Sequence, residues 1–208
     1  MNGAHDLGGV HGFGEIDRSQ TENFEHLWEE RVFALTLACG MLGQWNLDQS
    51  RFARENVDPG HYLQSSYYEH WLHGLETLLQ ERKLLESQSS NTNLKAIQAD
   101  AIQGVLAKGG PTLISTDTKP KFKVGDAIRV RNFNPSGHTR APRYIRGHGG
   151  TVQHYHGAHI FPDAHAESGK KVPAHLYSVR FEASDIWGPE GDKRSAVFVD
   201  VFEPYLES

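Results

Sequence analysis

The spacing of apolar residues changes partway along the chain, and this change limits the possible folds more than any other feature. Up to about residue 110, apolar side chains recur at steps of three and four residues, which is typical of helices. Beyond residue 118 they occur in short alternating runs separated by Gly, Pro and Asn, which is typical of strands. We therefore expect an α+β protein with a helical N-terminal half followed by a small antiparallel β-barrel.

Short motifs indicate where the helices of the first half begin. Segments 46–49 and 66–69 match the capping box, in which two side chains each bond the other residue's backbone amide. Asp58-Pro59 supplies an N-cap followed by a proline suited to the first helical turn. An apolar stripe over Phe24–Leu42 predicts the first helix, and a weaker pattern over residues 94–107 predicts the last one.

The helix that follows Ser66 has two distinct faces. One face carries an apolar stripe that we expect to enter the core. The neighbouring face holds Tyr67, His70 and Gly74, and Trp71 lies on the border between the two faces. An aromatic face with a small residue indicates that a second side of this helix is covered, by something outside this chain.

We divide the chain into four parts. Residues 1–20 are Gly-rich without an apolar period, and we expect an extended arm there. A helical domain is expected over residues 21–110, a linker over 111–118 and the small β-barrel domain over 119–208.

Composition excludes several classes of protein. Apolar residues make up 38% of the chain and charged residues 23%, which is enough for a core and excludes wholesale disorder. No apolar stretch is long enough for a membrane span, and the first residues lack the pattern of a signal peptide, so we expect a cytoplasmic protein outside the membrane. The single cysteine, Cys39, excludes an internal disulfide framework and any metal site built from several of this chain's cysteines.

Positive charge is concentrated in one segment of a chain whose net charge is −5. The segment Lys119–Arg146 holds eight Lys or Arg residues and a single acid, Asp126. Such a segment suits a phosphate, a nucleic acid or another anionic group, but a solvated surface explains it equally well. The negative total and the lack of regularly spaced aromatic residues argue against nucleic acid.

Histidine and nucleophile patterns give weak signals for chemistry. His154, His156 and His159 lie close in sequence, yet no acid or thiol stands near them at ligand spacing, so a polar turn is the simpler interpretation. No serine or cysteine nucleophile has an evident orienting pair. Taken alone, the chain looks like an incomplete enzyme.

Two arginines are better candidates. Arg51 lies in a short helix between the acids Asp48 and Glu55, and Arg140 follows a turn-forming segment. The planar guanidinium fork suits bidentate binding of an oxyanion. For any single arginine, a surface charge paired with an acid remains the alternative interpretation.

Six sequence blocks occur in one order from end to end: Met1–Gly9, Phe24–Glu29, Tyr67–Trp71, Gly137–Tyr144, Gly147–Val152 and Trp187–Glu207. Together they resemble the beta subunit of nitrile hydratase, and the likeness is weak only across Ser87–Thr118. The resemblance implies a barrel of the Src-homology-3 type, an obligate alpha subunit in an α2β2 assembly, and hydration of small nitriles to amides.

The resemblance also implies where the metal is held. In this family the alpha subunit binds cobalt(III) or iron(III) through three cysteine sulfurs and two backbone amides. Two of those cysteines are oxidised to sulfinic and sulfenic acids. We therefore expect no metal ligand in this chain. Trp71 favours cobalt over iron, because iron-type members tend to have tyrosine at that position.

Carried over residue by residue, the resemblance assigns two catalytic arginines. Arg51 and Arg140 are expected to bond the oxygens of the oxidised cysteines. The expected substrate-pocket residues are Leu47, Ser50, Tyr67, Tyr68, His70 and Trp71. Ser50 stands where the family usually has a larger apolar or aromatic residue, which leaves the preferred nitrile open.

Two related alternatives remain. The chain could be a thiocyanate hydrolase-type subunit, although there the two halves are separate polypeptides. It could also be a non-catalytic assembly or maturation partner of a nitrile hydratase alpha subunit. The joint presence of Arg51, Arg140 and a predicted barrel argues against a maturation partner.

Overall fold

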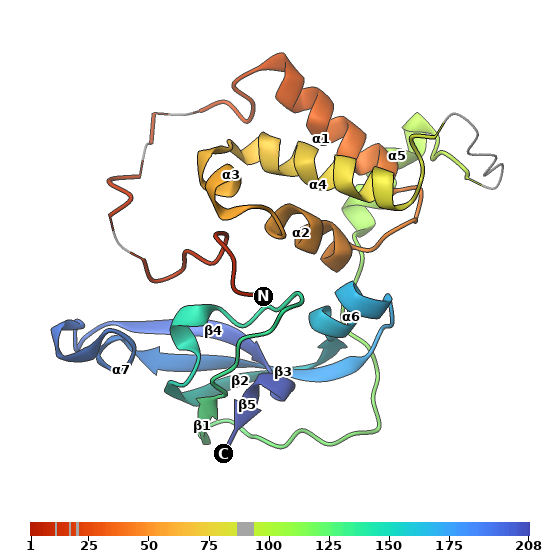
Figure 1. Cartoon of the computed structure of the whole chain (residues 1–208). Coiled ribbons are helices and arrows are strands. Elements are labelled where there is room, and N and C mark those ends of the chain that lie inside the picture. Colours follow the sequence, from red (N-terminus) through yellow and green to blue (C-terminus); the bar gives the residue numbers. More distant parts are fainter. Residues whose placement is uncertain (11, 17, 20, 87–93) are drawn as a thin grey trace. The chain divides into compact units, whose positions relative to one another are not determined.

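A computed structural model describes residues 1–10, 12–16, 18–19, 21–86 and 94–208. These residues divide into two compact units, one formed by residues 3–110 and the other by residues 1–2 together with 111–208. The first unit is helical and the second contains a sheet, which confirms the predicted α+β class (Figure 1). Among the described residues, no helix combines the length and the apolar character needed to cross a bilayer.

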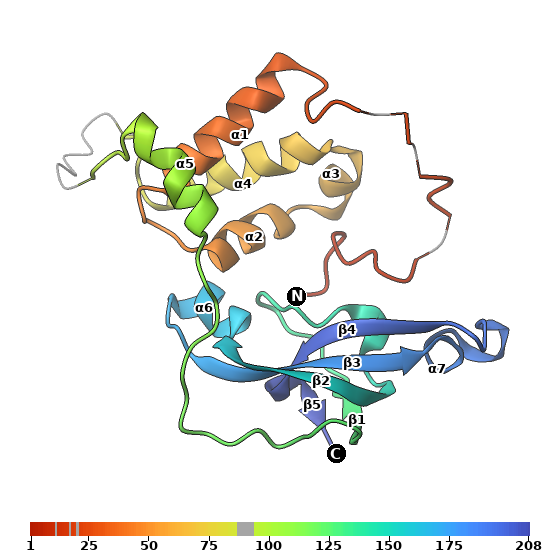
Figure 2. The same cartoon turned by 180° about the vertical axis from the view of Figure 1, so that it is seen from behind.

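The helical unit is built around α4, which lies between α1 and α2 (Figures 1 and 2). Its helices are α1 (Leu27–Gly40), α2 (Leu47–Glu55), α3 (Pro59–Gln64), α4 (Tyr67–Glu81) and α5 (Ala99–Lys108). The buried apolar side chains of this unit include Val32, Ala53, Leu75 and Leu78. Residues 94–98, which we expected to be helical, precede the start of α5.

The three helix starts that the capping motifs predict are confirmed. Asn46 caps α2, because its side-chain oxygen accepts from the amide of Gln49 at 2.9 Å while the Gln49 side chain accepts from the Asn46 amide at 3.0 Å. The amide of Ser66 donates to the carboxylate of Glu69 at 2.6 Å at the start of α4. Asp58 caps α3 as expected. These bonds satisfy amides that a helix start leaves without an intrahelical partner.

The buried face of α1 differs from the expected apolar stripe. Glu29, Val32 and Thr36 are buried, whereas Leu27 and Leu35 are 76% and 53% exposed. The three buried residues follow one another at helical spacing and share the side that packs within the unit. The two leucines lie on a different side of the helix, so periodicity identified an apolar stripe but not the side that is buried here.

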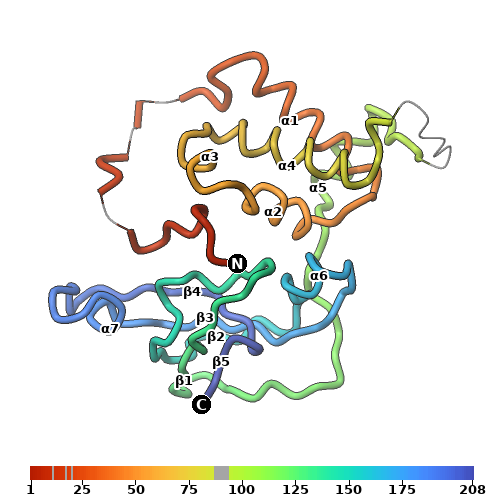
Figure 3. The backbone as a smooth tube through the Cα atoms, in the orientation of Figure 1, coloured from red at the N-terminus to blue at the C-terminus, as the bar shows by residue number. Residues whose placement is uncertain are grey.

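The second unit contains one antiparallel sheet with the strand order β4-β3-β2-β1-β5. Its strands are β1 (Ala127–Val130), β2 (Gly149–Ile160), β3 (Pro173–Glu182), β4 (Ala196–Phe202) and β5 (Leu206–Glu207). Figure 3 traces β2 and β3 side by side over most of their lengths, and register shifts interrupt their pairing. Helix α6 (Pro162–Ser168) follows β2, and α7 (Ala183–Trp187) follows β3. The sequence patterns had not indicated either helix.

The closed barrel that we expected is not confirmed. Within residues 1–2 and 111–208, β4 and β5 form the two edges of the sheet, and no pairing between them closes it. β5 has only two residues, and both pair with β1. The sheet is therefore open.

Gly150 allows the strands around it to pack closely. A Cβ atom at this position would lie 2.6 Å from Val179 Cγ1 and 2.9 Å from Phe181 Cε1. Val179 and Phe181 are fully buried members of the apolar core, so neither can move aside easily. At the adjacent Gly149, the nearest atom to a Cβ would be the carbonyl oxygen of Ile128, at 3.7 Å.

We predict that Gly150→Ala lowers the free energy of unfolding by about 1–3 kcal/mol, because the added methyl group overpacks the core. Gly149→Ala is the matched control, since the same methyl group meets only ordinary contacts there. Urea unfolding of the full chain, followed by circular dichroism, measures both changes. Equal stability of the two variants would contradict this account of the core.

Candidate functional site

Helix α2 presents Arg51 next to a buried acid. Leu47, Arg51 and Arg54 follow one another at helical spacing and share a face of α2, and Ser50 lies on the adjoining buried side. Arg51 Nη1 donates to Asp48 Oδ1 at 3.1 Å, and the Asp48 side chain is only 10% exposed, whereas that of Arg51 is 40% exposed. The carboxylate therefore orients a guanidinium group that remains accessible from outside the unit.

Arg54 lies against two of the predicted pocket residues. Its Nη2 donates to Ser50 Oγ at 3.1 Å, and its guanidinium carbon lies 3.8 Å from the centroid of the Trp71 ring. Burial lowers the pKa of Arg54, because it removes the cation from water. The sequence motifs assign no role to Arg54, although its spacing of four residues from Ser50 on the same helix could have indicated the contact.

Three of the expected pocket residues form an aromatic cluster at the start of α4. The ring centroid of Trp71 lies 5.8 Å from that of Tyr67 and 5.9 Å from that of Tyr68. Phe33 of α1 also contacts Trp71, at a centroid distance of 5.9 Å. Tyr67 is 64% exposed, so the cluster extends from the packed helices to the surface of the unit.

The structure separates His70 from this cluster. Its ring stacks on Tyr62 with centroids 4.0 Å apart, and its Nε2 donates to the carbonyl oxygen of Tyr62 at 2.8 Å. His70 therefore holds α3 against α4. Leu47, at the start of α2, is 55% exposed.

Arg140 lies in an irregular turn of the second unit, between β1 and the short 3-10 helix Arg143–Ile145. Its side chain is exposed, whereas Thr139 and Ala141 on either side are buried. The Arg140 amide donates to the phenol oxygen of Tyr205 at 3.2 Å, and this phenol donates to the carboxylate of Asp163. Side chains from distant elements thus fix the turn that carries Arg140.

The direction of the two hydrogen bonds at Tyr205 follows from the pKa shifts of Tyr205 and Asp163. Burial raises the pKa of the Asp163 carboxyl, and the hydrogen bond from Tyr205 opposes that rise. Burial and the nearby carboxylate raise the pKa of the Tyr205 phenol. The phenol therefore keeps its proton at neutral pH, and it can donate to Asp163 while it accepts from the Arg140 amide.

Arg146 supports the same turn from inside. Its guanidinium is buried and donates to the carbonyl oxygen of Ala141 through Nε at 3.0 Å and Nη2 at 2.7 Å. Its Nη1 donates to the carbonyl oxygen of Phe133 at 3.2 Å and to Asn2 Oδ1 at 2.5 Å. At least this arginine of the basic segment therefore has a structural role and is not part of a solvated surface.

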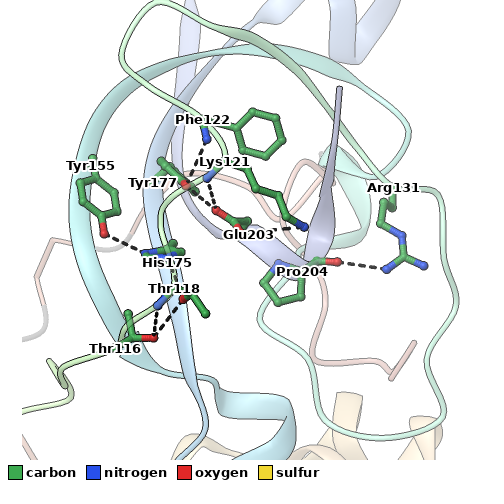
Figure 4. A network of polar contacts seen from close by, with 10 residues as sticks. All are labelled: Thr116, Thr118, Lys121, Phe122, Arg131, Tyr155, His175, Tyr177, Glu203 and Pro204. Carbon is green, nitrogen blue, oxygen red and sulfur yellow. Dashed lines mark hydrogen bonds and ion pairs between the residues drawn. The ribbon is translucent and has the colours of Figure 1, made fainter.

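A second polar network joins the segment before β1 to the sheet (Figure 4). His175 is buried, and its two ring nitrogens lie 3.1 Å from Thr118 Oγ1 and 2.8 Å from the Tyr155 phenol oxygen. The Glu203 carboxylate accepts from the Tyr177 phenol at 2.6 Å and from a backbone amide of the same segment. Both His175 ring nitrogens and the Glu203 carboxylate are bonded to the protein itself, which indicates a structural role.

The histidines of β2 do not assemble a metal site. The rings of His154 and His156 lie 4.7 Å apart, and His156 Nε2 lies 3.1 Å from Asp200 Oδ1. Across the part of the chain that the structure describes, no three His, Cys, Asp or Glu side chains gather in an arrangement that could hold a metal ion.

Arg51 and Arg140 belong to different units. Two family models match the chain. The model for the N-terminal part of the nitrile hydratase beta subunit matches residues 1–122, and the model for the C-terminal part matches residues 111–208.

Curated relatives match over their whole lengths. The cobalt-containing nitrile hydratase subunit beta of Pseudonocardia thermophila is 38% identical, over 100% of this chain and 96% of its own. The low-molecular weight cobalt-containing nitrile hydratase subunit beta of Rhodococcus rhodochrous is 37% identical, over 99% of both chains.

Among solved structures, the recombinant apo-enzyme of thiocyanate hydrolase from Thiobacillus thioparus has a chain that is 27% identical. That match covers 43% of this chain and 77% of the other, with a TM-score of 0.41, which is too low to support a conclusion about the fold. The two family models and the full-length relatives, by contrast, agree with each other from the first residue to the last. The chain belongs to the nitrile hydratase beta subunit family.

Proposed function

We propose that Arg51 and Arg140 make this chain's chemical contribution to nitrile hydration. As a nitrile hydratase beta subunit, the chain takes part in the addition of water to nitriles, which gives amides, with an alpha subunit as its partner. The observation that carries the functional assignment is the match of both family models to one chain. The same match favours a beta subunit that holds both parts in one polypeptide over a thiocyanate hydrolase-type subunit, in which the two parts are separate chains.

The geometry around Arg51 supports its proposed role. A guanidinium has five N–H donors, and its bond to Asp48 occupies one of them. We propose that other N–H groups of Arg51 bond the oxygens of the alpha subunit's oxidised cysteines. Sulfinate and sulfenate oxygens are anionic acceptors, and charge-assisted hydrogen bonds to them are stronger than neutral ones. The buried Asp48 orients the guanidinium before the partner binds.

The surroundings of Arg140 support a parallel role. Its side chain is exposed, but its backbone is held by Tyr205 and by the support that Arg146 gives to the neighbouring Ala141. We propose that Arg140 also bonds an oxygen of the oxidised cysteines. A fixed turn limits the conformational entropy that Arg140 loses when it makes that bond.

We propose that the metal is cobalt(III) in preference to iron(III), and that the alpha subunit binds it. Both relatives named above are cobalt-containing by name, and Trp71 favours the same metal. When bound, such a metal supplies Lewis-acid activation of the nitrile or of a water-derived nucleophile. We propose that the residues of this chain bind and orient groups around the metal and do not coordinate it.

The remaining expectations for the site are proposals of the same kind. Tyr67, Tyr68 and Trp71 form one cluster, and Ser50 is joined to Trp71 through Arg54, which supports a shared pocket wall. We also keep Leu47 and His70 as pocket candidates.

Several structural and cellular expectations also stay predictions. These are the α2β2 assembly, the cytoplasmic location, the Src-homology-3-like arrangement, the arm over residues 1–20 and the linker over residues 111–118.

We predict that Arg51→Lys and Arg140→Lys, each co-expressed with the alpha subunit, give assembled and metal-loaded complexes whose kcat falls by about 10²–10³-fold. Lysine keeps the charge but lacks the planar fork that bonds two oxygens. Amide formation and metal content measure the two properties separately.

Arg82→Lys and Arg143→Lys are the matched controls, because both arginines are exposed and each lies in the same unit as one of the test residues. We expect both controls to keep wild-type turnover. Wild-type turnover in Arg51→Lys or Arg140→Lys would refute the proposed role of that arginine.

We also predict that the purified chain alone produces no amide and binds less than stoichiometric cobalt or iron, because we assign the metal to the alpha subunit and the described residues gather no metal cluster. Elemental analysis and an amide assay test this directly. Adding the alpha subunit should restore both properties. A catalytically active chain without that subunit would show that the assignment of the metal to the partner is wrong.

A further inference from the structure

We propose that Arg54 is a positioning residue that determines which nitriles the enzyme accepts, because it fixes the indole of Trp71 and the hydroxyl of Ser50. This inference rests on the proposed function, in which Ser50 and Trp71 belong to the pocket wall. It adds a third residue, which neither the family match nor the sequence motifs indicate.

The head of the Arg54 side chain is held between two helices. Its Nη2 donates to Ser50 Oγ on α2 at 3.1 Å, and its guanidinium carbon lies 3.8 Å above the Trp71 ring on α4. A guanidinium stacked on an indole is attracted by the ring electrons, more strongly as the cation loses water. The group therefore restrains a buried hydroxyl and a large aromatic ring together.

The stem of the Arg54 side chain is also held. A Cβ atom at Gly74 would lie 2.5 Å from Arg54 Cγ and 3.2 Å from the Arg54 backbone nitrogen. Gly74 is buried, so the absence of a side chain there is what lets α2 and α4 approach at this point. With stem and head both in contact, few rotamers remain for Arg54.

Placing a cation at the position of Arg54 costs free energy, because burial removes water from the charge. Packing alone would not require a charged side chain there. Burial lowers the pKa of Arg54, and the same burial weakens the hydration of its charge. A methionine could fill similar space without that loss. The charge and the planar fork instead act on Trp71 and Ser50, which are the groups that we place next to the substrate.

Trp71 transmits the effect of Arg54 to the rest of the aromatic cluster. Its ring contacts Phe33, Tyr67 and Tyr68 at centroid distances between 5.8 and 5.9 Å. If the indole turns, the exposed Tyr67 loses its contact with Trp71 and keeps the contact with Tyr68. We therefore expect the fixed indole to restrict the proposed pocket, which favours small aliphatic nitriles. When the indole is released, the pocket gains space for aromatic nitriles.

The test compares acetonitrile with benzonitrile in the complex of full-length alpha and beta subunits. For Arg54→Met we expect KM for acetonitrile to rise while kcat stays within about twofold. The ratio of kcat/KM values should shift toward benzonitrile by about tenfold, within the range for changes in pocket shape. This ratio does not depend on how much complex assembles, so a merely structural role would leave it unchanged.

Three further variants complete the experiment. Arg54→Lys keeps the charge and should show an intermediate ratio. Gly74→Ala keeps Arg54 but displaces its stem, and it should shift the ratio in the same direction even if Arg54→Met fails to assemble. Arg82→Met, which removes an exposed arginine at the end of α4, is the matched control and should keep the wild-type ratio.

The outcomes separate this inference from the proposed function. If wild type hydrates both nitriles and Arg51→Lys is inactive, the proposed function holds. A wild-type ratio in Gly74→Ala and in every assembled Arg54 variant then overturns the inference alone. Equal loss with both nitriles overturns it too, because it indicates a general defect. If Arg51→Lys turns over like wild type, the proposed role of Arg51 fails, whatever the ratio shows for the Arg54 variants.

Discussion

The packing of α2 against α4 is the constraint on which the helical unit depends. α2 buries Asp48, Ser50 and Ala53, and this orientation leaves Arg51 partly exposed on the neighbouring side of the helix. Because Asp48 is an acid in a buried position, a nearby cation compensates its charge, and Arg51 lies one turn further along the helix. The same burial that stabilises the unit therefore orients its proposed catalytic side chain.

In the second unit, polar side chains fix a turn that has no strand or helix of its own. The Arg140 amide is bonded to Tyr205, and Arg146 satisfies the carbonyl oxygen of Ala141. Buried polar groups of this kind are stable only when their hydrogen bonds are made, so the turn has one well-defined conformation. A side chain on such a turn can be placed as accurately as one on a helix.

Local sequence signals predict where the elements begin, but not all of the contacts between them. The cap at Asn46 needs only residues within one turn, and helical spacing is enough to place Tyr67 and Trp71 together. His70 is adjacent to Trp71 in sequence but bonds the backbone of α3, and Arg54 meets Trp71 from another helix. The buried side of α1 and the open sheet likewise depend on which elements pack, and periodicity does not contain that information.

The segment that leads into β1 is bonded to the sheet that follows it. Thr118 contacts the buried His175, and the amide of Lys121 donates to Glu203, close to the last strand (Figure 4). Its position is thus set by residues from the far end of the chain. Residues from Thr112 onward bond β2 as well, so anyone who divides this polypeptide into two co-expressed fragments should cut it upstream of Pro111, where the second unit begins.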